Sequence, residues 1–245
     1  MTLKDDLEKN RTDYLVSVAK ATVGIVPGIG SFLSEIVESI IPNQRIDRLT
    51  KYLIELNEKL EKIPVEKLST FLNNEAFIDL IEESFLHASR VLTDERRQYI
   101  ISIILNGLSD ENIKLEESKY LLKLLQEIND AEIIWLRWFY LYSSSFKESK
   151  EYVEKNKSIL QENIPHEPKD IRINRLAFSN GYKEHLGRLG LITTEIKYAL
   201  NEKKLSSSES IQKNINIDSK KTKITSLGLI LLNEIGLIEN KPQLG

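Results

Sequence analysis

The sequence predicts a mainly α-helical protein in which a multi-helix bundle is followed by a small α+β module. Three observations support this fold class. Apolar residues recur at helical spacing over most of the segment 1–162. A proline-containing break follows at 163–168. Beyond it the pattern becomes helix, helix, short strand, polar loop, short strand and helix. We therefore expect a helical domain over 1–162 and a second module over 169–238.

The clearest helical period lies between Asn43 and Ile63. Its apolar residues alternate spacings of three and four: Ile46, Leu49, Leu53, Leu56, Leu60 and Ile63. This stripe has the a/d pattern of helices that pack along a seam. It fits either a seam within one chain or a short dimerising coiled coil.

Further along, polar residues indicate where helices begin and end. Thr93 is a good N-cap before Asp94 and Glu95, and Gly107 ends that helix. We expect Asp130 to cap a helix over 131–142, which is apolar on almost every side and therefore central to the fold. A Lys/Glu-rich helix follows at about 146–160.

A glycine-rich apolar loop occupies 22–31, where three glycines and one proline disfavour a continuous helix. Gly30 is followed by Ser31 and Phe32 rather than Lys and Ser/Thr, which excludes a phosphate-binding P-loop. One interpretation is a tight turn between helices. The other is an apolar hairpin over 22–41 that contacts a membrane surface or a partner through Val26, Pro27, Gly28, Ile29, Phe32 and Leu33.

Composition argues against several kinds of site. The chain has no cysteine, so disulfides and thiolate zinc sites are excluded. Its three histidines show no metal-ligand spacing, and the pair Glu83 and His87 predicts only a surface contact. The N-terminus is charged, and the longest uncharged stretch, 21–34, is shorter than a membrane span. We expect a cytoplasmic protein that is not an enzyme and has no cofactor.

Charge is unevenly distributed along the chain. Between Lys169 and Thr225 there are 12 Lys/Arg and 6 Asp/Glu, a net charge of +6, whereas the remainder carries −9 within a total of −3. Such asymmetry indicates either an anionic partner for the basic part or a solvated surface with a local bias.

The C-terminal module has the element order of a winged helix. We expect a helix over 171–189, interrupted near Asn180 and Gly181 and ending in Leu-Gly-Arg-Leu-Gly-Leu-Ile at 186–192. Short strands at 195–200 and 222–225 flank a flexible polar wing, 201–221. Thr225 then caps a helix that Gly236 ends.

Winged helices bind DNA or act as protein-interaction modules, and both alternatives stay open here. The DNA alternative places contacts somewhere in 169–225. The basic candidates in that segment are Arg172, Arg175, Lys183, Arg188, Lys203, Lys204, Lys220 and Lys221.

Two longer stretches resemble a known family. Residues 90–139 contain a helix ending Ile-Leu-Asn-Gly-Leu-Ser, then Leu-Leu-Lys-Leu-Leu, then Ile-Asn-Asp-Ala-Glu-Ile-Ile. This order resembles bacterial abortive-infection alpha-type proteins. The Val-Pro-Gly-Ile-Gly-Ser loop, with Arg45-x-x-Arg48 after it, is similar to related uncharacterised bacterial proteins. The long wing 201–221 departs from that pattern.

The resemblance implies a role in phage defence, as a toxic or sensing component, and supplies no catalytic residues. The leading hypothesis is therefore a non-enzymatic defence protein that acts through a protein partner, self-association or sensing. The alternatives are a winged-helix DNA-binding regulator and a membrane-perturbing effector that uses 22–41.

Overall fold

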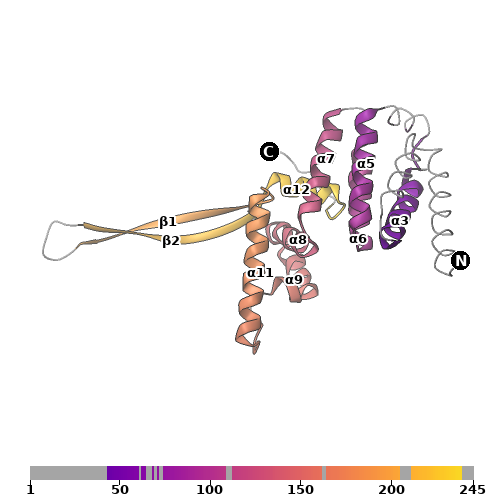
Figure 1. Ribbon diagram of the computed structural model, residues 1–245. Coiled ribbons are helices and arrows are strands. Elements are labelled where there is room, and N and C mark those ends of the chain that lie inside the picture. Colours follow the sequence, from indigo (N-terminus) through magenta and orange to yellow (C-terminus); the bar gives the residue numbers. More distant parts are fainter. Residues whose placement is uncertain are drawn as a thin grey trace. The chain divides into compact units, whose positions relative to one another are not determined.

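The computed structural model describes residues 43–60, 62–64, 68, 71, 74–108, 112–161, 164–204 and 211–238. These residues are mainly helical and include one two-stranded antiparallel sheet near the C-terminus (Figure 1). The predicted class, mainly α with a small β element, is confirmed. The glycine-rich loop 22–31 and its six candidate contact residues lie outside the described residues.

Contacts divide the chain into two compact units. Unit 1 comprises Met1–Glu127 with Glu234–Gly236, and unit 2 comprises Ile128–Asn233 with Leu237–Gly245. The proline-containing segment 164–168 lies inside unit 2. The domain limits inferred from the sequence stay a prediction.

Unit 1 is built from α3 (Asn43–Leu60), α5 (Glu75–Arg90), α6 (Asp94–Asn106) and α7 (Asn112–Glu127). Helix α5 packs against the other three. The three-four stripe of α3 is buried where α3 meets α5 and α6, with Leu49, Leu53, Leu56 and Leu60 each no more than 2% exposed. The structure thus favours a seam within one chain.

The helix boundaries in unit 1 largely follow the predicted caps. Thr93 Oγ1 accepts a hydrogen bond from Arg96 N at 3.3 Å and starts α6, and Gly107 ends it. A Cβ at Gly107 would lie 2.5 Å from Ser118 Oγ, so glycine also allows α6 and α7 to approach closely. Both predictions are confirmed.

His87 corrects one expectation. It is buried, at 4% exposure, and its Nε2 lies 3.6 Å from Glu83 Oε1. Burial lowers the pKa of His87, while Glu83 acts in the opposite direction. The expected surface contact was wrong because α5 is covered by three other helices.

Unit 2 contains the remaining elements, apart from Glu234 at the end of α12. They are α8 (Asp130–Ser144), α9 (Phe146–Lys155), α10 (Lys157–Leu160), α11 (Lys169–Arg188), β1 (Ile192–Lys204), β2 (Ile211–Ile224) and α12 (Ser226–Glu234). Helix α8 packs against α9, α10, α11 and β2, which places it at the centre of this unit.

Three helix boundaries in unit 2 differ from prediction. The N-cap of α8 is Asn129 rather than Asp130, because Asn129 and Glu132 form a reciprocal capping box. The Lys/Glu-rich helix divides at Asn156, whose backbone N–H bonds back to Tyr152 and Val153. Helix α11 continues through Gly181, where the cost of glycine relative to alanine, about 1 kcal/mol, does not interrupt it.

The two strands form one long hairpin. They pair in register from Ile192 with Ile224 to Lys204 with Ile211, with an irregularity between Lys197 and Tyr198. The hairpin therefore spans about 40 Å at 3.3 Å per residue. Most of the predicted flexible wing 201–221 is strand, because β1 and β2 continue their antiparallel pairing beyond the short strands expected from the sequence.

The base of the hairpin is held by a compact turn. Thr225 donates its backbone N–H to Leu191 O at 3.0 Å and its hydroxyl to Gly190 O at 2.6 Å. Its Oγ1 also accepts from Gly228 N at 3.1 Å, which confirms Thr225 as the cap of α12. A Cβ at Gly228 would lie 2.3 Å from Leu191 O, so this position requires glycine.

Candidate interaction surface

Two of the basic residues predicted to contact nucleic acid are instead engaged inside unit 2. Arg175 forms an ion pair with Glu167, whose side chain is 7% exposed, and its Nη1 donates to Ser158 O at 3.0 Å. Lys183 Nζ lies 4.6 Å from the ring centroid of Trp135, which is 2% exposed. Both side chains therefore contribute to packing around α11.

A third contact reinforces the junction of α11 with α8. His185 Nδ1 lies 2.7 Å from Glu132 Oε1, and the Glu132 side chain is only 3% exposed. Glu132 Oε2 also accepts from Asn129 N, so the carboxylate joins the α8 cap to α11. Lys183 and His185 are two residues apart on α11, and Glu132 and Trp135 are three apart on α8. Both contacts join α11 to α8.

The other basic candidates do not converge on one patch. Arg172 and Arg188 are exposed but sit on opposite sides of α11, roughly 160° apart at 100° per residue. Lys220 and Lys221 are exposed neighbours near the base of β2, so the strand pleat directs them to opposite faces. Lys203 and Lys204 lie in paired β1. Their side chains are outside the described part.

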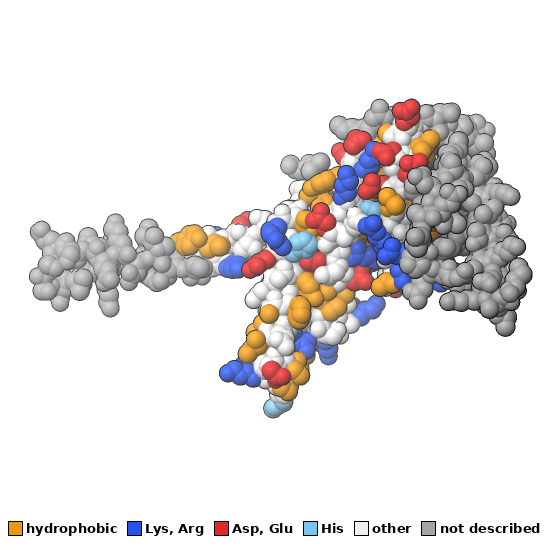
Figure 2. Space-filling view, in the orientation of Figure 1, with side chains coloured by type: hydrophobic (Ala, Val, Ile, Leu, Met, Phe, Trp, Pro, Cys, Tyr) orange, Lys and Arg blue, Asp and Glu red, His pale blue; other side chains and the backbone are white. Residues whose placement is uncertain are grey.

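Sequence reasoning missed a different set of residues, the exposed apolar side chains of unit 2. On α11, Phe178 is 65% exposed, and on β1, Tyr198 is 62% exposed. Figure 2 shows hydrophobic side chains along α11 and on the near part of the hairpin. The set also includes Ile171, Ile173 and Ile196. In the sequence these residues are marked only by being apolar within otherwise polar stretches.

An aromatic row on α8 connects the interior of unit 2 to its surface. Trp135 and Trp138 meet edge to face with centroids 5.4 Å apart, and Trp138 lies 5.3 Å from Tyr142. Trp135 is buried, whereas Tyr142 is 56% exposed and Phe146 beyond it 66%. The exposed end of this row therefore presents aromatic side chains, which are enriched at protein interfaces.

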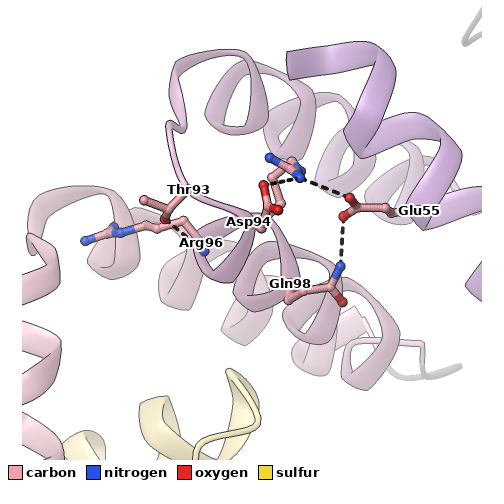
Figure 3. Close-up of polar contacts among 6 residues, drawn as sticks. Glu55, Thr93, Asp94, Arg96 and Gln98 are labelled. Atoms are coloured by element: carbon pink, nitrogen blue, oxygen red, sulfur yellow. Dashed lines mark hydrogen bonds and ion pairs between the residues drawn. The ribbon is translucent and has the colours of Figure 1, made fainter. Parts of the chain in front are cut away.

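Unit 1 holds its charged residues differently. Arg97 is 4% exposed and binds Glu55 Oε1 at 3.1 Å and Asp94 Oδ1 at 2.6 Å. Gln98 Nε2 donates to the second oxygen of Glu55 at 2.8 Å (Figure 3). Burial lowers the pKa of Arg97, but the bonds to the two carboxylates outweigh it and raise that pKa. The cluster joins α3 to α6 and has the features of a structural clamp.

The described residues include no group of three acidic or histidine side chains arranged to hold a metal ion. None of the helices in the described ranges is both long enough and apolar enough to cross a membrane. The membrane-contact hypothesis for 22–41 falls on residues that are not described and stays a prediction.

Comparisons with known proteins return no match to a family model, to a curated protein or to a solved structure.

Proposed function

We propose that this chain is a non-enzymatic bacterial phage-defence protein of the abortive-infection type, and that unit 2 binds a protein partner. The order α11, β1, β2, α12 would then be a winged-helix-like module used for protein interaction. The observation that carries this proposal is the set of large apolar side chains exposed on α11 and β1.

The exposed residues are arranged as a binding face requires. Ile196 and Tyr198 occupy alternate positions of β1. The extra residue of the irregularity between Lys197 and Tyr198 is Asp218 on β2, so the alternation of β1 is kept and the two side chains share one face of the hairpin. They are 41% and 62% exposed. In contiguous patches, such side chains mark sites of protein or ligand contact. Tyrosine suits this role because its ring is apolar and its hydroxyl forms hydrogen bonds.

The defence context rests on the resemblance of residues 90–139 to abortive-infection alpha-type proteins. The contacts in unit 2 support interaction over DNA reading, because Arg175 and Lys183 are engaged internally. A helix that reads DNA presents basic and polar side chains to the groove, whereas α11 exposes Ile171 and Phe178.

The test combines Ile196→Asp with Tyr198→Asp in full-length protein and measures phage plaque counts on cells that express it. The matched control is Tyr120→Asp, which alters a 51% exposed tyrosine on α7 of unit 1. We expect the double variant to lose protection at unchanged expression and thermal stability, while the control keeps it. Equal plaque counts for cells with and without the wild-type gene, over a broad phage panel, would contradict the proposal.

A second function, DNA binding, is favoured by the lysines near the base of the hairpin. Lys197, Lys220 and Lys221 are all exposed. Phosphate contacts of this kind weaken steeply with salt. An electrophoretic shift at low salt that is reduced by Lys220→Ala with Lys221→Ala, and by Arg188→Ala, would support it. Absence of any shift at about 50 mM salt would remove it.

A further inference from the structure

Helix α11 carries a second pattern that the proposed function leaves unused. Six residues occur at alternating spacings of four and three: Asp170, Asn174, Ala177, Gly181, Glu184 and Arg188. This spacing keeps them on one line along the helix, here called the α11 seam. All six are exposed, whereas Ser179 and Leu186, on the other side of α11, are buried.

The α11 seam is complementary to itself when reversed. When a second α11 runs antiparallel to the first and the two are centred on Ser179, Asp170 of one helix faces Arg188 of the other. In the same way Asn174 faces Glu184, and Ala177 faces Gly181. An antiparallel second copy would therefore place a carboxylate against a guanidinium at both ends. The amide of Asn174 would face the carboxylate of Glu184 in between. Over 18 residues the seam is about 27 Å long.

The centre of the seam is shaped for close helix contact. Ala177 and Gly181 have the smallest side chains available, and a Cβ built on Gly181 meets no atom within 4 Å. Small side chains at the crossing allow two helix axes to approach closely. The residues that follow seam positions along the chain include Ile171, Phe178 and Tyr182. Ile171 and Phe178 are exposed and Tyr182 is half-buried, so closing the seam would bury their remaining apolar surface on one flank.

We infer that the α11 seam binds the α11 seam of a second copy of this chain, antiparallel and with two-fold symmetry. In such a dimer each flank faces the same flank of the partner, so Phe178 meets its own equivalent. The occupant is a second copy because charge complementarity requires it. An unrelated acidic or basic ligand would meet the wrong charge at one end. The inference rests on the proposed function only in treating unit 2 as an interaction module.

The experiment exchanges the charges of the seam in the full chain and measures mass by sedimentation equilibrium. Wild-type protein should be dimeric. Asp170→Arg alone and Arg188→Asp alone each oppose like charges at both ends, and should weaken the dimer by about tenfold or more in dissociation constant. An equimolar mixture of the two single variants restores both acid–base pairs and should re-form a heterodimer.

Two further variants separate the interface from general effects. Arg172→Asp reverses an exposed charge on α11 away from the seam and should leave the dimer unchanged. Gly181→Leu adds a good helix former in open space, so α11 should remain folded while the close approach is blocked.

Three results would overturn the inference: a monomeric wild type at all concentrations, single variants that dimerise normally, or a mixture that stays monomeric. These outcomes are distinct from failure of the proposed function. If the wild type is monomeric but Ile196→Asp with Tyr198→Asp still abolishes protection, only self-association falls. If the dimer forms but plaque counts are the same with and without the gene, only the defence function falls.

Discussion

Helices α3 and α11 both carry residues at alternating spacings of three and four, and they use the pattern in opposite ways. On α3 the pattern is filled by leucines and is buried inside unit 1. On α11 it is filled by small and charged residues and is exposed. The difference shows that spacing selects one face of a helix, while side-chain chemistry decides whether that face joins the core or remains available to a partner.

The largest expected effect is on the α3 stripe. Leu53 is 1% exposed, so Leu53→Ala leaves a cavity and should lower the free energy of unfolding by about 2–5 kcal/mol. Urea denaturation of the full chain measures this change. Leu92→Ala, at a residue 75% exposed, is the control and should change stability little. A loss under about 1 kcal/mol for Leu53→Ala would mean that the stripe is not a packed seam.

A smaller effect is expected at the clamp that holds α3 to α6. Arg97→Met removes a buried guanidinium that binds Glu55 and Asp94, and should cost about 2 kcal/mol. Asp94 is 82% exposed at its side chain and can be hydrated after the substitution, which limits the loss. The measurement is the melting temperature of Arg97→Met, compared with that of Arg172→Met, which alters an exposed arginine. We expect the lower melting temperature for Arg97→Met. Equal melting temperatures for the two variants would show that the clamp contributes nothing.

The dependence of the free energy of unfolding on pH should report the burial of His87 on α5. Burial lowers the pKa of His87 below its ordinary value of 6.5, and Arg90 and Lys123 act in the same direction against Glu83. The unfolded chain therefore binds a proton more readily, and the free energy of unfolding should fall as pH drops from about 6.5 towards the lowered pKa. Above about 6.5 this contribution is fully retained.

His87→Gln should flatten this part of the pH profile, measured by urea denaturation at about pH 7.5 and about pH 5.5. His166→Gln alters an exposed histidine and serves as the control. If both variants keep the wild-type slope, another group causes it.

The smallest effect is expected on the α11 seam. Asp170→Arg reverses an exposed charge in the first turn of α11, where a carboxylate is favoured by the helix dipole, so the stability of unit 2 should fall by only about 1 kcal/mol. Circular dichroism melting at a concentration below the dimer dissociation constant measures it. A loss similar to that of Leu53→Ala would show that the seam packs within the chain, and the contrast between α3 and α11 would disappear.

Local signals in the sequence predicted much of the helical structure. Thr93 and Thr225 cap the helices that follow them, because capping depends on a side chain and a backbone N–H three residues away. Local signals failed at Gly181 and in 211–224. In both places, interactions with neighbouring elements outweigh the intrinsic preference of the residues.

The candidate surface was less predictable than the fold. Arg175 and Lys183 were selected for their charge, but charge alone does not reveal whether a side chain points outward. The partner of Arg175 is Glu167, 8 residues away in the sequence, and the partner of Lys183 is Trp135, 48 residues away. The exposure of Phe178 and Tyr198 was equally hidden, since an apolar residue is expected to be buried unless the packing leaves it outside.

The sequence by itself determined the helical class, the leucine stripe of α3 and the caps at Thr93 and Thr225. These features depend on periodicity and on contacts within a few residues. Only the tertiary structure decided that the basic residues of α11 are divided between inner contacts and opposite sides of the helix. It also decided that the seam from Asp170 to Arg188 faces outward. Which side of a helix is covered depends on distant segments that pack against it, and that information is not local to the helix.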